Sequence, residues 1–254
     1  MTFQKKFQVK KNFFSNLEGN EIEKIELNGF QSLKNLENLY LFSNKLSKNE
    51  ANLFQHLEKL KILYFGDNQK NSIELNEFLG LESLEELDLA YSDIDKLEFN
   101  SFQHLNKLKK LNLHHNKINQ IDSNAFQFIE NLEELDLGWN GLKKIGVNLF
   151  SNLKTLKKLN LNNNEINQID SDGFQGLENL EVLDLSYNVL IKVDSNSFQH
   201  LKKLKVLCLY QNKIEQIDVK AFQDLENLEE LELRGNDFPE IKSASFKHLK
   251  KLKK

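Results

Sequence analysis

The sequence predicts a curved α/β solenoid, with a parallel β-sheet on the concave side and short helical turns or irregular segments on the convex side. Three observations predict it: an unbroken 24-residue period, an alternating Leu-x-Leu segment in each unit, and a column of phenylalanines. A fixed period of this length is typical of a solenoid. The leucine that opens each unit recurs at Leu36, Leu60, Leu84, Leu108, Leu132, Leu156, Leu180, Leu204, Leu228 and Leu252.

The unbroken period leaves no linker between domains, so we expect one elongated domain. We expect residues 1–35 to form an N-terminal cap plus a degenerate first repeat, because 12–35 keeps part of the pattern and a terminal unit must cover the core. Residues 36–251 then hold nine 24-residue repeats. Residues 252–254 begin a further repeat, with no C-terminal cap. Positions are numbered below as slots, with the opening leucine in slot one.

Slots four to six carry the strand signal. In repeat 108–131, Leu111-Asn112-Leu113 alternates with the period of a short strand, and strands of successive repeats must run in the same direction. Slots two, three, five, seven and eight then face outward. An asparagine in slot nine, such as Asn116, can both donate and accept hydrogen bonds where the chain turns. Ser92 replaces this asparagine once, which predicts a weaker turn.

Slot nineteen carries phenylalanine in ten units, as at Phe126. Phenylalanine is bulkier than leucine, so the column should hold the back of the coils further apart than the front and curve the stack. We expect a short helical turn around each phenylalanine, opened by residues such as Asp122 or Ser123.

Composition limits the partner and the compartment. The net charge is −4, with 34 basic and 38 acidic residues, so we expect no nucleic acid partner. No apolar run has the length of a bilayer span, so we expect no membrane insertion. Cys208 is the single cysteine, and no signal peptide or Asn-x-Ser/Thr sequon is visible. These features favour a cytoplasmic location, with an extracellular one as the alternative.

The pattern LxxLxLxxNxIxxIxxxxFxxLxx, nearly unbroken at 108–131, 156–179 and 204–227, resembles the 24-residue typical form of the leucine-rich repeat. The resemblance implies a horseshoe that binds proteins or other ligands on its concave face and adjoining edges. It extends to Toll-like receptor ectodomains and secreted matrix proteoglycans, whose cysteine-rich caps this chain lacks. Lys70 and Asn49 stand where the repeat expects apolar residues.

Outward charges alternate from repeat to repeat, which doubles the true period to 48 residues. Glu85 and Glu86 are followed by Lys109 and Lys110, and the alternation continues along the chain. Lysine rows then lie between glutamate rows on neighbouring strands. We interpret this pattern as a self-neutralising structural ladder; the alternative is a charge code for a partner.

Outward aromatic residues are the best candidates for a binding site, because rows of exposed rings are uncommon without a partner. We predict a ligand surface centred on Trp139, with small residues at 90, 138 and 186 leaving room beside the rings. The alternative is that the rings pack on one another. The candidate site comprises Tyr91, His114, His115, Trp139, Tyr187 and Tyr210, with Asp88, Asp136 and Asp184 supplying polar contacts.

The sequence contains no catalytic or phosphate-binding motif, and its histidines are too far apart for a shared metal. We expect neither a metal nor a cofactor, no enzymatic activity, and a scaffold that binds a protein partner. The alternatives are an ectodomain fragment of an adhesion or innate-immune receptor and the substrate-recognition arm of an enzyme whose catalytic domain lies elsewhere. We also expect self-association through the uncapped C-terminal end.

Overall fold

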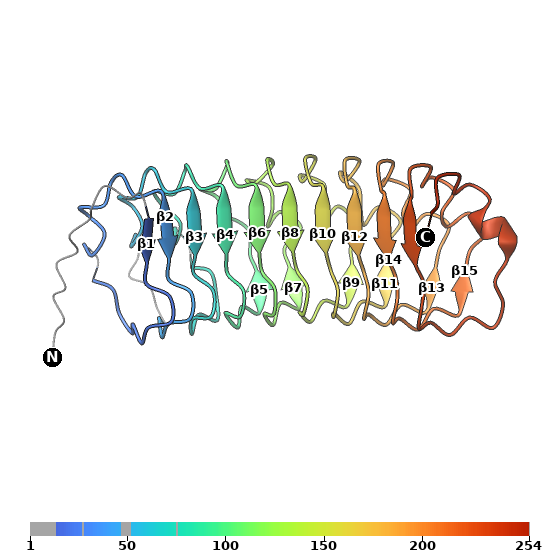
Figure 1. The fold of residues 1–254 in the computed structure, drawn as a ribbon, viewed down its shortest axis with the longest axis horizontal. Helices are drawn as coiled ribbons and strands as arrows, with labels where there is room; N and C mark the ends of the chain where they lie inside the picture. Colours follow the sequence, from blue (N-terminus) through green and yellow to red (C-terminus); the bar gives the residue numbers. More distant parts are fainter. Residues whose placement is uncertain (1–13, 27, 47–51, 75, 254) are drawn as a thin grey trace.

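The computed structural model describes residues 14–26, 28–46, 52–74 and 76–253 as a stack of coils (Figure 1). Each coil contributes one three-residue strand to a parallel sheet of ten strands, ordered β1-β2-β3-β4-β6-β8-β10-β12-β14-β16. The strands of this sheet are β1 (Phe14–Asn16), β2 (Asn38–Tyr40), β3 (Ile62–Tyr64), β4 (Glu86–Asp88), β6 (Lys110–Asn112), β8 (Glu134–Asp136), β10 (Lys158–Asn160), β12 (Val182–Asp184), β14 (Val206–Cys208) and β16 (Glu230–Glu232).

The sheet keeps one register from end to end, as the repeat predicts. Leu87 pairs with Leu111, which pairs with Leu135, so every slot of one coil lies beside the same slot of the next. The slot-four and slot-six leucines point inward and are fully or almost fully buried. Strand β1 joins at the same register, pairing Phe14 with Asn38, so the degenerate first repeat supplies a strand. The cap residues expected at 1–13 lie outside the described residues.

The convex side is more regular than the sequence suggested. Two-residue strands form three separate parallel pairs there, β5–β7, β9–β11 and β13–β15. Their bounds are β5 (Lys96–Leu97), β7 (Gln120–Ile121), β9 (Lys144–Ile145), β11 (Gln168–Ile169), β13 (Lys192–Val193) and β15 (Gln216–Ile217). These strands were not predicted.

Helical turns around the phenylalanines, in contrast, are almost missing. Within the described ranges, the one helix is a 3-10 turn, η1 (Ser243–Phe246). Elsewhere the segment consists of successive turns, such as that closed by the Ala125 N–H donating to the Asp122 carbonyl at 2.9 Å. Asp122 does open its turn as predicted, since its Oδ1 accepts a hydrogen bond from the Asn124 N–H at 2.8 Å.

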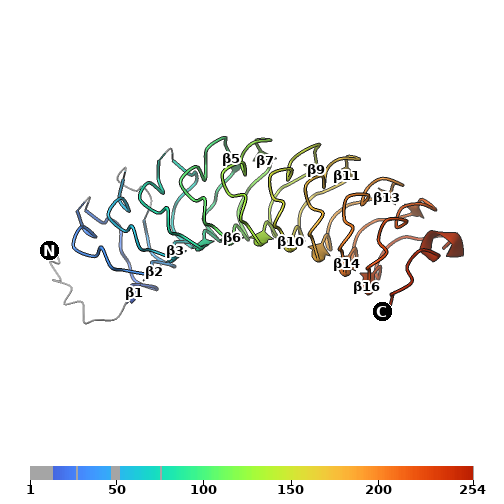
Figure 2. The same ribbon diagram turned by 90° about the horizontal axis from the view of Figure 1, so that it is seen from above.

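The phenylalanine column curves the molecule. Phe126, Phe150 and Phe174 are buried, and their neighbouring ring centroids lie 6.1 and 6.3 Å apart. Strands in the sheet are only about 4.8 Å apart. Because the back of each coil is wider than its front, the stack bends with the ten-stranded sheet on the concave side, as predicted (Figure 2).

Buried asparagines in slot nine tie each coil to the one before it. The Asn164 amide donates to the carbonyls of Leu161 in its own coil and Leu137 in the preceding coil, at 3.1 and 3.0 Å. Its Oδ1 accepts a hydrogen bond from the Leu142 N–H at 3.0 Å. The same three contacts recur at Asn44, Asn116 and Asn188 for the equivalent carbonyls and N–H groups. The column therefore pairs backbone groups that the turn would leave unpaired inside the protein.

The repeat 60–83 departs from this pattern and buries an ion pair. Lys70 and Glu77 occupy slots that hold Ile118 and Ala125 in the regular repeat, and their side chains are 4% and 1% exposed and in contact. The Lys70 ammonium also lies 5.6 Å from the centre of the Phe65 ring. Asn49, the other irregular position, lies outside the described residues.

Ser92 replaces the slot-nine asparagine in the coil that follows the one with the ion pair. It is fully buried, its N–H donates to Asn116 Oδ1 at 3.0 Å, and its hydroxyl donates to the Ala90 carbonyl at 3.3 Å. An asparagine at position 92 would accept a hydrogen bond from the Lys70 N–H. That N–H instead donates to the Asn68 carbonyl at 2.8 Å. The weaker turn stays a prediction.

The last described coil is less covered than those before it. Leu207 and Leu209 are fully buried, whereas their counterparts Leu231 and Leu233 are only partly buried. Self-association through this end also stays a prediction.

Replacing Asn164 by alanine should lower stability by about 1–3 kcal/mol, because the buried Leu142 N–H loses its partner. The Leu137 and Leu161 carbonyls each keep one donor, the amides of Asn140 and Asn188. Asn167→Ala is the matched control, since Asn167 is exposed in the same coil. Urea denaturation followed by circular dichroism measures both. Equal midpoints for the two variants would contradict the structural role of the column.

Replacing both members of the buried ion pair, Lys70→Ile with Glu77→Ala, should leave stability unchanged or raise it, because apolar packing often matches a buried pair. Each single replacement should destabilise by about 3–5 kcal/mol, because the buried charge that remains loses the opposite charge of the ion pair. A double-mutant cycle in urea tests this expectation. Additive effects of the two replacements would show that the charges are not coupled.

Candidate functional site

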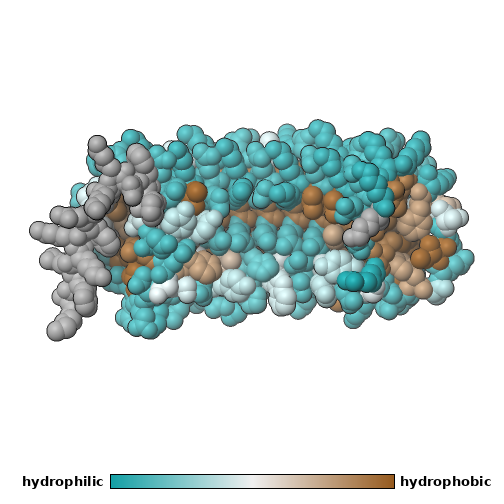
Figure 3. Space-filling model, in the orientation of Figure 1, coloured by the Kyte–Doolittle hydropathy of each residue, from teal (hydrophilic) through white to brown (hydrophobic). Residues whose placement is uncertain are grey.

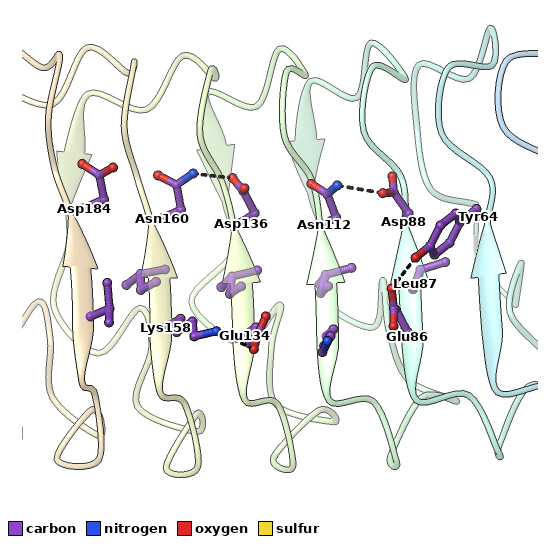
Figure 4. A pocket seen from close by; sticks show the side chains of 15 residues that line it. Tyr64, Glu86, Leu87, Asp88, Asn112, Glu134, Asp136, Lys158, Asn160 and Asp184 are labelled. Atoms are coloured by element: carbon purple, nitrogen blue, oxygen red, sulfur yellow. Dashed lines mark hydrogen bonds and ion pairs between the residues drawn. The ribbon is translucent and has the colours of Figure 1, made fainter.

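The concave face holds a shallow open groove of about 550 Å³ that runs across β4, β6, β8 and β10. Its floor is the strand backbone at the row of slot-four leucines, whose side chains point into the core. This row appears as a stripe of hydrophobic residues between hydrophilic rows (Figure 3). Two rows of polar side chains border it, slot three on one side and slot five on the other (Figure 4). Tyr64 lies at one end and Val182 at the other.

The slot-three row consists of Glu86, Lys110, Glu134 and Lys158, and much of its charge is satisfied internally. Lys158 Nζ contacts Glu134 Oε1 at 2.9 Å. The Tyr64 hydroxyl donates to Glu86 Oε1 at 2.6 Å, and this hydrogen bond to a carboxylate raises the pKa of Tyr64 well above its usual range. The row therefore presents mixed and largely paired charge to the groove.

The slot-five row alternates aspartate and asparagine, and each side chain caps its own strand. Asp136 Oδ1 accepts a hydrogen bond from the Gly138 N–H at 2.8 Å, and Asn160 Oδ1 accepts one from the Asn162 N–H at 3.0 Å. Amides also link the row sideways, since Asn160 Nδ2 donates to Asp136 Oδ1 at 3.0 Å. The same arrangement joins Asn112 Nδ2 to Asp88 Oδ2 at 2.7 Å.

The predicted aspartates thus share one row, with a structural role that the sequence analysis missed. Burial raises the pKa of Asp88, although hydrogen bonds from Ala90 and Asn112 oppose the rise. Asp136 and Asp184 line the same groove from β8 and β12. The sequence signal for the linking amides was present, because Asn112 and Asn160 alternate with the aspartates in one slot.

The predicted aromatics lie on the loop that leaves each strand, at the rim of the sheet. Tyr91, Trp139 and Tyr187 are 47–49% exposed, which makes them among the most exposed large apolar side chains described. All three have positive φ angles, between 53° and 57°. Slot eight adopts this conformation in every described repeat from Ser43 to Gly235, so the coil imposes it.

The backbone conformation therefore does not explain the choice of aromatic residues. A positive φ is best tolerated by glycine, asparagine and aspartate, and bulky side chains are uncommon there. The repeat uses Asp67 and Asn163 at two of the same positions. The presence of aromatic residues at positions 91, 139 and 187 therefore needs an explanation other than backbone conformation.

The rings form two contacting groups. His115 stacks on Tyr91 with centroids 4.5 Å apart and lies 5.6 Å from Trp139, while Tyr187 meets Tyr210 edge to face at 5.3 Å. The packing of rings on one another, weighed as the alternative, is therefore present, and about half of each slot-eight aromatic surface still faces solvent.

His114 connects the aromatic rim to the groove, and Arg234 extends the rim. His114 lies 6.0 Å from Tyr91 by ring centroid, and its Nδ1 lies 3.4 Å from Asp136 Oδ1. Arg234 lies over the Tyr210 ring at 5.7 Å, a neighbour that the sequence analysis did not include. The sequence signal was present, because Arg234 occupies the same slot as Tyr210 one repeat later.

Small residues precede the rings in slot seven. A Cβ at Gly138 would lie 2.5 Å from Asn162 Oδ1, so glycine leaves the space that this side chain of the next coil occupies. Ala90 and Ser186 are 3% and 0% exposed, and the Ser186 hydroxyl donates to Asp184 Oδ1 at 2.5 Å. The room that these residues were expected to leave beside the rings stays a prediction.

The predicted charge ladder is present at the outer edge of the sheet, in slot two. Each lysine contacts the glutamate of the preceding coil. The pairs are Lys61–Glu37, Lys109–Glu85, Lys157–Glu133, Lys205–Glu181 and Lys253–Glu229, with N–O distances of 2.6–2.8 Å. Hydrogen bonds from the lysines lower the pKa of Glu85, Glu133, Glu181 and Glu229.

Groups of metal-ligating side chains and membrane-spanning helices are absent among the residues that the structure describes. Across the four described ranges, no three His, Cys, Asp or Glu side chains gather closely enough to hold a metal ion. No helix in the described part of the chain has the length and apolar character of a bilayer span. The groove and rim are therefore the features that a function must explain.

A stack of parallel coils with an open concave sheet defines a solenoid repeat scaffold. The model of the BspA type leucine rich repeat region matches residues 119–253 in 6 copies, which is more than half of the chain. A leucine rich repeat model also matches residues 43–94 and 83–142. The chain belongs to the leucine-rich repeat family, which confirms the resemblance inferred from the sequence. A comparison with curated proteins found no significant match.

Solved structures share the fold over most of this chain. The TLR13–ssRNA13 complex matches with a TM-score of 0.82 and 29% identity, covering 94% of this chain and 38% of that one. A leucine-rich repeat protein of Leptospira interrogans matches at 0.80 and 29%, covering 94% and 59%. Toll in the Drosophila Toll–Spatzle complex matches at 0.73 and 22%, covering 90% and 33%, which shows the fold alone. The chain spans less than two thirds of each of these proteins.

The slot-two ladder should make stability fall at acid pH. Glutamates whose pKa is lowered in the folded state stabilise it above the unfolded pKa of 4.5, and this contribution is lost as pH falls through the folded pKa. The variant Lys109→Gln/Lys157→Gln/Lys205→Gln should have a lower urea midpoint at pH 7 and a smaller further loss near pH 3. The control removes three exposed lysines outside the ladder, Lys154, Lys213 and Lys220. Parallel pH profiles for both variants would argue against the ladder.

Proposed function

We propose that this chain is a non-catalytic scaffold that binds a protein partner through the concave face and its rim. The observation that carries the proposal is the contact between the two surfaces: a groove on an uncovered sheet adjoins a rim where three aromatic side chains remain about half exposed. Aromatic side chains are the usual anchors of protein interfaces. Their positions are held by backbone hydrogen bonds, such as that from the Trp139 N–H to the Asn162 carbonyl at 2.8 Å, so little order has to be gained on binding.

Charge favours a protein over a nucleic acid. The structural neighbours include a complex with single-stranded RNA and a complex with the protein Spatzle. A nucleic acid needs basic residues to neutralise its phosphates. The groove of this chain is lined by five acidic residues and two lysines, and the net charge of the chain is −4.

The Toll and TLR13 neighbours support one alternative, in which the chain is an ectodomain fragment of an innate-immune or adhesion receptor. The chain covers 33% and 38% of those proteins. A role as the substrate-recognition arm of an enzyme would use the same surface. In each case this surface would bind the partner, and catalysis or signalling would belong to other parts of the protein.

The double variant Trp139→Ala/Tyr187→Ala should weaken partner binding by roughly tenfold or more, because it removes two anchor side chains. Partners captured from a lysate on the wild-type chain are purified and their dissociation constants measured by biolayer interferometry. The matched control is Phe99→Ala/Val147→Ala, which removes two equally exposed apolar side chains, 49% and 54%, from the convex side. Equal losses for both variants, or none for the first, would count against the rim.

A further inference from the structure

We propose that the groove binds a positively charged segment in the polyproline II conformation, with an arginine or lysine at every third residue. This inference rests on the proposed function, because it names the chemistry of the partner for the concave face. Three properties of the groove support it: an excess of carboxylates, the spacing of the slot-five aspartates, and the apolar ends.

The uncompensated charge lies in the slot-five row. The alternating acidic and basic pattern neutralises slot two, and it neutralises part of slot three through the Lys158–Glu134 pair. The slot-five aspartates have neutral partners: Asn112 for Asp88, Asn160 for Asp136, and the Ser186 hydroxyl for Asp184. Among the described residues, none of the three aspartates forms an ion pair with a lysine or arginine. His114, beside Asp136, is the one basic ring in contact with the row. The row therefore attracts cations from outside the chain.

The spacing selects the conformation of the ligand. The three aspartates lie on β4, β8 and β12, each two strands from the next, which is about 9.6 Å. A polyproline II helix has three residues per turn and rises about 3.1 Å per residue, so every third side chain lies on one face about 9.3 Å apart. A β-strand places alternate residues on one face and would turn every second cation of such a series away.

The ends of the groove suit the rest of such a segment. Tyr64 presents a ring at one end and Val182 presents an aliphatic side chain at the other, and both are partly exposed. Proline rings pack well on aromatic surfaces, which is how other proteins bind extended proline-rich segments. The preformed polyproline II helix also loses little entropy on binding.

Synthetic peptides test the proposal directly. The probe is a fluorescein-labelled peptide of repeated Arg-Pro-Pro triplets, and fluorescence anisotropy measures its binding to the full chain at low and at physiological salt. A comparison peptide has the same composition with its arginines contiguous, and a second replaces arginine with glutamate. We expect the triplet peptide to bind most tightly, with an affinity that falls as salt rises. Equal binding of both arginine peptides, or tighter binding of the acidic one, would overturn the proposal.

The variant Asp88→Asn/Asp136→Asn/Asp184→Asn removes the charges with little expected effect on the fold. Asn112 and Asn160 show that an asparagine in slot five still accepts the hydrogen bond from the N–H two residues on. We expect the variant to lose roughly tenfold in affinity for the triplet peptide. The matched control Glu85→Gln/Glu133→Gln/Glu181→Gln removes three carboxylates from slot two and should keep the preference for the triplet peptide. A loss as large in this control would show that only net charge matters.

The failure of this inference differs from the failure of the proposed function. If captured protein partners lose affinity in the Trp139→Ala/Tyr187→Ala variant while the triplet peptide shows no preference, the scaffold function stands and the basic segment is excluded. If the triplet peptide binds as predicted but the rim variant has no effect on any partner, the groove is the binding site and the rim is not.

Discussion

The slot-nine asparagine is the interaction on which the rest of the structure depends. A coil of 24 residues must turn inward after each strand, and the turn would bury carbonyl and N–H groups without partners. One amide contacts both its own coil and the preceding one, as Asn164 does with Leu161, Leu137 and Leu142. The coils are therefore joined in a fixed register. The residue just before the asparagine is turned outward with a positive φ, so the same turn creates the rim on which the aromatic side chains stand.

The repeating unit of the structure is a pair of coils. On the concave side the pair unites a glutamate coil with a lysine coil, as in the Lys109–Glu85 contact. On the convex side the two-residue strands also join in twos, with β5 pairing β7 and β9 pairing β11. At the rim, Gly138 leaves the space that Asn162 of the next coil fills. The 48-residue period seen in the charges is therefore also present on the convex side and at the rim, while the core columns keep the 24-residue period.

The sequence predicted the features that one repeat determines and missed those that depend on the distance between coils. The leucine, asparagine and phenylalanine columns were sufficient for the parallel register, the buried amides and the direction of curvature. The convex strands were missed because two residues such as Gln120-Ile121 carry no detectable alternation. The contact of His115 with Tyr91 and Trp139 was left open, because ring orientation depends on spacing along the stack. Lys70 was recognised as irregular, but its partner Glu77 lies in another slot and was not identified.

The same 48-residue period has opposite consequences in slot two and in slot five. In slot two, the alternation of glutamate and lysine brings opposite charges together and leaves little net field. In slot five, the alternation of aspartate and asparagine provides Asp88 and Asp136 with hydrogen bonds from neutral amides rather than with a lysine or arginine. Hydrogen bonds from neutral amides hold an aspartate in place without cancelling its charge. A surface that is rigid and still charged is what electrostatic recognition requires, because the ligand then supplies the missing charge and the protein has little reorganisation to undergo.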